Sequence, residues 1–128
     1  MILHYTDAGR AASGFAAVER LDCSVRAVAI ALRLSYAQAH GKLKALGRRT
    51  GCKLYKSPAV FLDGLGLVQR PDLSCRTVAT AVRYMTEGRF IVRVPQHVFA
   101  VIDGIIFDTR EDAPLPGRRV RMVYEVPK

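Results

Sequence analysis

The sequence of 128 residues contains no tryptophan and only three cysteines, Cys23, Cys52 and Cys75. An odd number of cysteines without a CxxC pair indicates neither a disulfide framework nor a tetrahedral zinc site, so we expect no metal and no cofactor. Free thiols are typical of a reducing compartment. The histidines His4 and His40 stand alone and add no second ligand at a metal-binding spacing.

The sequence also lacks a long hydrophobic run. Its longest apolar stretch, residues 27–32, is far shorter than the roughly 20 residues that a membrane-spanning helix needs. The first ten residues, MILHYTDAGR, carry an acidic residue and have no apolar h-region of a signal peptide. We therefore expect no membrane partner and a cytoplasmic protein, with packaging in a virion as the other location that stays open.

Acidic residues are few compared with basic ones, which gives a formal net charge of +9. The basic residues form two clusters, one of Lys42, Lys44, Arg48, Arg49, Lys53 and Lys56 and one of Arg118, Arg119 and Arg121. Such clusters are commonly solvated faces that keep a protein soluble. They could also attract an anionic partner such as nucleic acid, and charge alone does not decide between the two interpretations.

The length and the absence of linkers or low-complexity tracts predict a single domain over residues 1–128. Helical periodicity and capping residues predict helices over 23–33, 36–46, 57–64 and from Asp72 or Ser74 to Met85. A period of two predicts strands over 2–5, 90–94, 97–102, 105–108 and 120–126. Helices that come first and antiparallel strands that follow indicate an α+β fold.

Cys23 occupies the predicted first turn of a helix. Unpaired N–H groups and the helix dipole favour negative charge there, and the thiolate is the reactive form of cysteine. Cysteine is also a small apolar residue that is commonly buried, so this position alone does not make it catalytic. Asp22 can cap the helix and can pair with Arg26 four residues later, although Arg26 could instead bind a substrate carboxylate.

Asp103-Gly104 predicts a hairpin with a two-residue type I′ turn. The resulting register places Phe99 opposite Asp108, and the alternation of side chains then puts His97 and Asp108 on one face, diagonally adjacent. A carboxylate at that place can accept the imidazole N–H and fix the histidine tautomer. Without the cysteine, a hairpin pair that merely packs would be the simpler interpretation.

A cysteine that opens a helix, a histidine on a later strand and an aspartate on the next strand resemble the papain-like cysteine peptidase superfamily. Asp22-Cys23-Ser24 resembles the nucleophile motif of the bacteriocin-processing and NlpC/P60 peptidases. Residues 97–109, HVFAVIDGIIFDT, are similar to the histidine-strand, glycine-turn, strand-aspartate segment of the bacteriocin-processing type. The chain is also similar to small bacteriophage proteins with a DCxVRA motif, a helix that begins with SY and an HVFAVIDG hairpin.

The resemblance implies a papain-like α+β fold, with N-terminal helices packed on a small antiparallel sheet from the C-terminal half and the nucleophile at the start of the first helix. It implies a thiol hydrolase, a cysteine peptidase or isopeptidase, with Cys23, His97 and Asp108 as catalytic triad and a protein or peptide substrate. The glutamine that usually precedes the nucleophile is absent from residues 1–22. The backbone N–H of the cysteine can supply one oxyanion donor, and Ser24 or Gln96 are candidates for the second.

Two other functions stay open. The missing glutamine is compatible with a catalytically inactive papain-like module that serves as a phage binding protein or virion component. The predicted helices over 23–33 and 36–46, followed by basic residues, could instead imitate a helix-turn-helix in a small basic nucleic-acid-binding domain. Cys75 also opens a predicted helix, but no family motif falls on it, and we interpret it as a core or surface thiol.

Overall fold

The computed structural model describes residues 2–14, 22–48, 64–108 and 117–128. The helices in these ranges are α1 (Arg10–Ser13), α2 (Cys23–Ala31), α3 (Tyr36–Ala45), the 3-10 helix η1 (Pro71–Leu73) and α5 (Val78–Val82). The strands are β1 (Ile2–Tyr5), β2 (Val68–Gln69), β3 (Arg89–Val94), β4 (His97–Ile102), β5 (Ile105–Asp108) and β6 (Met122–Glu125). Within the described residues, no helix is long and apolar enough to cross a membrane.

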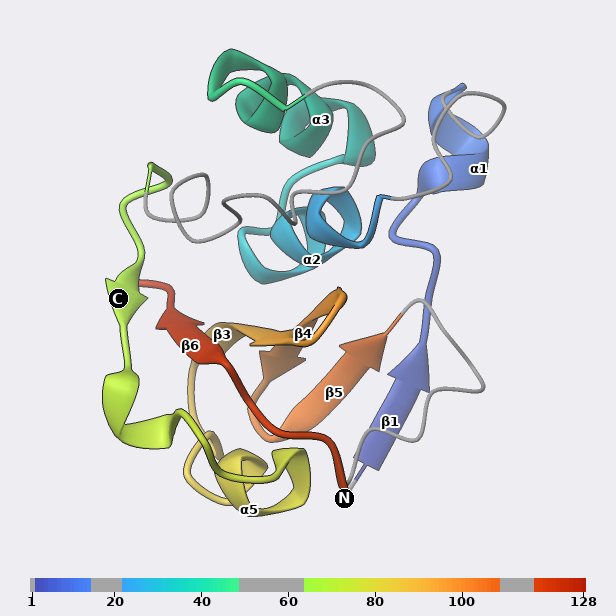
Figure 1. Cartoon of the computed structure of the whole chain (residues 1–128). Helices are drawn as coiled ribbons and strands as arrows, with labels where there is room; N and C mark the ends of the chain where they lie inside the picture. The colour runs from blue at the N-terminus through green and yellow to red at the C-terminus, as the bar shows by residue number, and fades with distance from the viewer. Residues whose placement is uncertain (1, 15–21, 49–63, 109–116) are drawn as a thin grey trace.

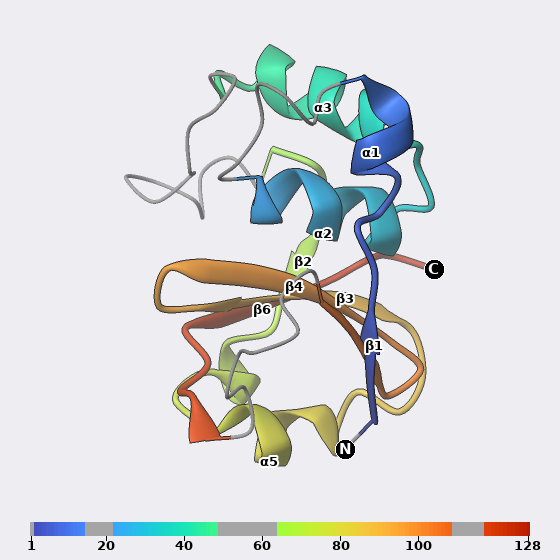
Figure 2. The same cartoon turned by 90° about the vertical axis from the view of Figure 1, so that its right-hand side faces the viewer.

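The strands form one sheet with the order β1-β5-β4-β3-β6-β2, covered by α2 on one face and by α5 on the other, and α3 packs on the outer side of α2 (Figures 1 and 2). This arrangement confirms the α+β class. The expectation of a sheet built only from the C-terminal half is wrong, because β1 lies parallel to β5 and forms one edge. Parallel pairing needs a long connection between the strands, and the helical part of the chain provides it.

The two hairpins of the sheet follow from local turn chemistry. Asp103 and Gly104 have φ angles of 50° and 81°, the two positive values that a type I′ turn requires. Ile102 pairs with Ile105, and the pairing continues through residues 100 and 107, which confirms this part of the predicted register. The β3–β4 hairpin turns at Pro95-Gln96, so His97 is the first residue of β4.

Two hydrophobic cores lie on opposite faces of the sheet. The α2-side core contains Val25, Ala27, Val28, Ala29, Ala31, Tyr36, Ala39, Leu43, Ile91, Val98, Ala100 and Tyr124. The α5-side core contains Leu73, Val78, Ala81, Val82, Met85, Phe90, Val92, Val94, Phe99, Val101, Ile106, Val120 and Val123. Successive residues of β4 therefore alternate between the two cores, as the pleat of a strand requires.

The N-terminal helices partly match the expected pattern. Ser35 caps α3 in a reciprocal capping box with Gln38. The helix that begins at Cys23 is not the first helix, because the one-turn α1 precedes it. The predicted helix over 57–64 lies outside the described residues.

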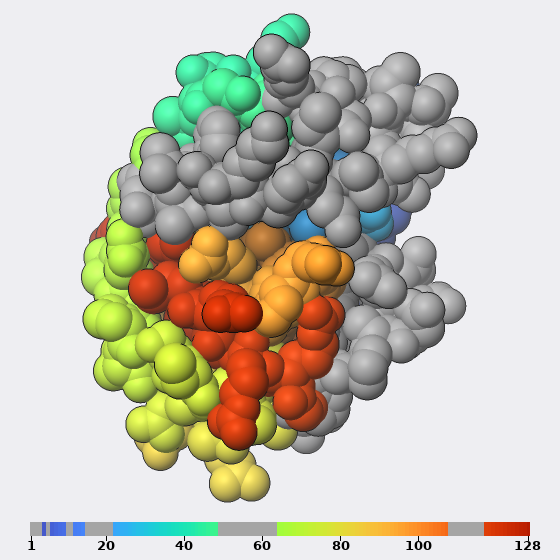
Figure 3. Space-filling view, viewed as in Figure 1, coloured from blue at the N-terminus to red at the C-terminus, as the bar shows by residue number. Residues whose placement is uncertain are grey.

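The helix predicted from Asp72 or Ser74 to Met85 is wrong in its first half. The α-helix starts at Val78, after Thr77, whose side chain accepts a hydrogen bond from the Thr80 N–H. Cys75, two residues before Thr77, has a φ of 65° and donates its N–H to the Val120 carbonyl at 2.8 Å. This non-local pairing with residues 118–120 keeps residues 75–77 out of the helix, and the two segments adjoin at the surface (Figure 3). The final strand is likewise shorter than the predicted 120–126.

Candidate active site

Cys23 is the first residue of α2, and its side chain is partly buried. The helix lies between α3 and the sheet and packs against β4. Figures 1 and 2 both show that α2 begins above the end of the sheet where β3 turns into β4. The predicted nucleophile and the strand that carries the predicted base therefore start at the same end of the molecule.

Asp22 precedes the cysteine and has no exposed surface. Its Oδ1 atom accepts hydrogen bonds from Nε and Nη2 of Arg26 at 2.9 and 2.7 Å, which confirms the predicted pair. Its Oδ2 atom accepts a hydrogen bond from the Tyr36 hydroxyl at 2.6 Å. The prediction that Asp22 caps α2 is wrong, because its side chain makes no capping bond and its φ and ψ of −113° and 24° lie outside the usual capping conformation.

His97 is buried at the start of β4, with 4% of its surface exposed. Its ring stacks on Phe99, with the ring centroids 6.1 Å apart and an interplanar angle of 28°. Phe99 belongs to the α5-side core, whereas α2 covers the other face of the sheet.

Asp108 is the last residue of β5, the strand that lies next to β4. Its backbone pairs with Tyr5 of β1. If the β4–β5 register continues by one residue, Asp108 stands opposite Phe99 and two positions from His97. Its side chain lies outside the described part of the structure, so the contact between this carboxylate and the imidazole stays a prediction.

The two candidate oxyanion donors lie in different surroundings. Ser24 follows the nucleophile in α2 and is 2% exposed, and no described group forms a hydrogen bond with its hydroxyl. Gln96 is exposed in the β3–β4 turn, with a positive φ of 62°. Gln96 therefore stands beside His97 at the end of the sheet, whereas Ser24 is enclosed next to Cys23.

Tyr36 is a residue of this region that the sequence analysis missed. Its ring lies in the α2-side core, while its hydroxyl reaches Asp22. His40 stacks on it with a centroid distance of 6.3 Å. The one sequence signal for Tyr36 is its place directly after the capping Ser35, in the SY pair at the helix start.

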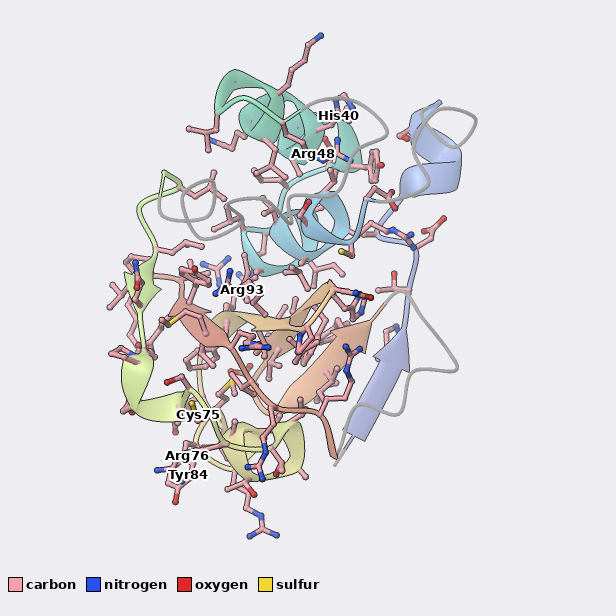
Figure 4. The ribbon with its side chains drawn as sticks, viewed as in Figure 1. His40, Arg48, Cys75, Arg76, Tyr84 and Arg93 are labelled. Carbon is pink, nitrogen blue, oxygen red and sulfur yellow. The ribbon has the colours of Figure 1, made fainter. Side chains whose placement is uncertain are left out.

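The second described cysteine, Cys75, lies at the end of the molecule opposite α3. Figure 4 shows Cys75, Arg76 and Tyr84 together near α5, whereas His40 and Arg48 lie at α3. Cys75 is exposed, and its carbonyl accepts a hydrogen bond from Arg119. Cys52 lies outside the described residues, and among the described ones no group of three His, Cys, Asp or Glu side chains could hold a metal ion.

Comparison with known proteins finds no matching family model, no matching curated protein and no matching solved structure. The fold and the site therefore define an α+β domain with a cysteine at the start of a helix that packs on the sheet. Any narrower assignment depends on the motifs and on the geometry of α2 and β4.

Proposed function

We propose that this chain is a thiol hydrolase of the papain-like type, a cysteine peptidase or isopeptidase that acts on a protein or peptide. Cys23 is the nucleophile, His97 the base and Asp108 the residue that orients the base. One observation carries the proposal: α2 begins over the end of the sheet at which β4 begins. A bacteriophage protein of this kind would act in the host cytoplasm or in the virion.

The reaction follows from the chemistry of these three groups. His97 accepts the thiol proton, and the Cys23 sulfur attacks the carbonyl carbon to form a tetrahedral intermediate. The intermediate expels the amine, which takes the proton from the imidazolium, and leaves a thioester on the sulfur. Water, deprotonated by the imidazole, hydrolyses the thioester and restores the thiol. Asp108 accepts the other imidazole N–H and stabilises the imidazolium.

Alkylation by iodoacetamide tests the proposal without knowledge of the substrate. Cys23 is partly buried and Cys75 is exposed, so accessibility alone makes Cys75 the faster thiol. At about pH 6 an ordinary thiol with a pKa near 8.5 is less than about 1% ionised. We expect Cys23 to react at least about tenfold faster than Cys75 at this pH, because its thiolate is stabilised. Peptide mass spectrometry measures the two rates in one sample.

Substitution of histidine identifies the cause of this selectivity. We expect His97→Gln to abolish the preference for Cys23, because the imidazolium that stabilises the thiolate is lost. His4→Gln is the matched control, since His4 is an exposed residue of β1. Equal alkylation of Cys23 and Cys75 in the unmodified chain would exclude an activated thiol.

A catalytically inactive module with the same fold is the second candidate, and one observation favours it. The His97 ring stacks on Phe99, a residue of the α5-side core. An imidazole that remains there packs the hairpin and does not activate the thiol. This candidate predicts that Cys23 reacts no faster than Cys75 and that His97→Gln changes neither rate, so the same experiment separates the two functions.

A further inference from the structure

A buried ionic network precedes the first residue of α2. Asp22 is 0% and Arg26 is 8% exposed, and the guanidinium binds one carboxylate oxygen with two nitrogens. The Tyr36 hydroxyl binds the other oxygen, which connects the start of α2 to the first residue of α3. The negative charge beside Cys23 is therefore compensated by a cation from the same helix and by a donor from the next one.

The network keeps Asp22 from the role that aspartate usually has at a helix start. An aspartate at this position commonly accepts a hydrogen bond from the second or third N–H group of the helix. Asp22 makes no such bond to α2. If it did, its charge would occupy the positive end of the helix dipole next to the sulfur. A second negative charge at that place would disfavour the thiolate.

We propose that Arg26 and Tyr36 are positioning residues that hold the Asp22 carboxylate away from the start of α2, so that this helix start stabilises the Cys23 thiolate. The inference rests on the proposed function, because it takes Cys23 as the nucleophile. It assigns the network a part in setting the charge state of the thiol as well as a part in joining two helices.

The elements that pack against α2 carry other charged or titratable residues, which remain unchanged in the test below. His40 comes from α3, Arg93 and Arg89 come from β3, and His97 and Asp108 come from β4 and β5. Arg89 donates to the Ala31 carbonyl at 2.8 Å, at the far end of the helix, where a cation interacts favourably with the dipole. Asp22 and Arg26 are thus the charged pair that lies nearest to Cys23 along the chain.

The test is the pH profile of Cys23 alkylation by iodoacetamide in the full chain. We expect Arg26→Gln to raise the midpoint of this profile by about one pH unit, a tenfold loss of thiolate below the midpoint, because a cation is lost. We expect Asp22→Asn to lower the midpoint, because an anion is lost while Arg26 remains. Tyr36→Phe should raise the midpoint by a smaller amount. Arg26→Lys retains the cation, so its midpoint should stay close to that of the unmodified chain.

Opposite shifts distinguish this assignment from a purely structural role. Variants that merely loosen the helix start would move the midpoint in the same direction, toward that of an ordinary thiol. Arg33→Gln controls for net charge, since Arg33 is exposed beyond the other end of α2. Midpoints that shift in the same direction in Asp22→Asn and Arg26→Gln, or that do not shift, would overturn the inference. If Arg26→Gln does not fold, Tyr36→Phe and Asp22→Asn provide the same comparison of signs.

The same profile separates this inference from the proposed triad. Failure of the triad appears as an unchanged midpoint in His97→Gln while the two network variants still shift it in opposite directions. Failure of the network assignment appears as a midpoint that responds to His97→Gln and not to the network variants. The measurement reports thiol ionisation and therefore needs no substrate.

Discussion

The carboxylate of Asp22 illustrates how burial selects one of several roles that are open to a side chain. At an exposed helix start, an aspartate can bind a backbone N–H at little cost. Asp22 has no exposed surface, and a buried carboxylate needs a full counter-charge and several donors. Arg26 and Tyr36 provide these, so pairing prevails over capping.

At this scale the sequence predicts only the local half of the network. The spacing of Asp22 and Arg26 by four residues predicts their contact, because one helical turn brings them together. The contact with Tyr36 depends on how α3 docks on α2, which residue spacing does not report. The same limit applies to the triad: the position of Cys23 in its helix is confirmed, while the meeting of sulfur, imidazole and carboxylate stays a prediction.

Removal of the Tyr36 hydroxyl tests how much the network stabilises the fold. We expect Tyr36→Phe to lower the free energy of unfolding by about 1.5 to 3 kcal/mol, because a hydrogen bond to a buried charged group is lost. Urea denaturation measures the difference. Tyr84→Phe is the control, because Tyr84 is 57% exposed, and we expect a change within about 0.5 kcal/mol. Equal effects of the two substitutions would contradict a stabilising role for the network.

The elements differ in how far local rules determine them. The β4–β5 hairpin forms as predicted because the Asp103-Gly104 turn fixes its own backbone geometry. The segment before α5 does not form the predicted helix, because Cys75 and Arg76 pair with the distant Val120. Helix α2 has seven buried residues among its nine, so it is a core helix with both sides covered and not a surface helix with one apolar stripe.

Two glycine substitutions test the local rules with opposite expected signs. Gly104 has a φ of 81°, and we expect Gly104→Ala to destabilise the chain by about 1 to 2 kcal/mol. Gly41 lies in α3, where no described atom beyond its own helix backbone comes within 4 Å of the place that an alanine Cβ would take. We therefore expect Gly41→Ala to stabilise the chain by about 0.5 to 1 kcal/mol. Thermal or urea unfolding of both variants checks the signs. A neutral Gly104→Ala would mean that the turn does not determine the hairpin.

At the scale of the whole molecule, the α+β class follows from the order of helical and strand periodicities, but the edges of the sheet do not. Strand β1 joins the sheet beside β5, whose residues follow about a hundred positions later. Strand β2 has only two residues and pairs with β6 at the other edge. Periodicity describes single elements and carries no information on which distant elements pair, so both edges could be found only from the structure.

The distribution of charge is a further property of the whole molecule. Residues 118–120 pair with residues 75–78, and the Arg70 N–H donates to the Val123 carbonyl. These contacts between the two segments gather arginines that the sequence separates: Arg70, Arg76, Arg118, Arg119 and Arg121. Arg70 pairs with Asp72 and Glu125. Arg76, Arg118 and Arg119 donate to backbone carbonyls, which carry no compensating charge. With a net charge of +9, repulsion among these side chains opposes folding.

Salt should therefore stabilise this protein. Added ions screen repulsion between exposed charges, and the screening length falls from about 30 Å at 0.01 M to about 8 Å near 0.15 M. We expect the thermal unfolding midpoint to rise when NaCl increases from about 10 mM to about 200 mM, and to rise less in Arg119→Gln, because one of the clustered charges is gone. Thermal scans by circular dichroism measure both shifts. A midpoint that falls with salt would mean that attractive ion pairs such as Arg70 with Asp72 outweigh the repulsion, and the arginine cluster would then not limit stability.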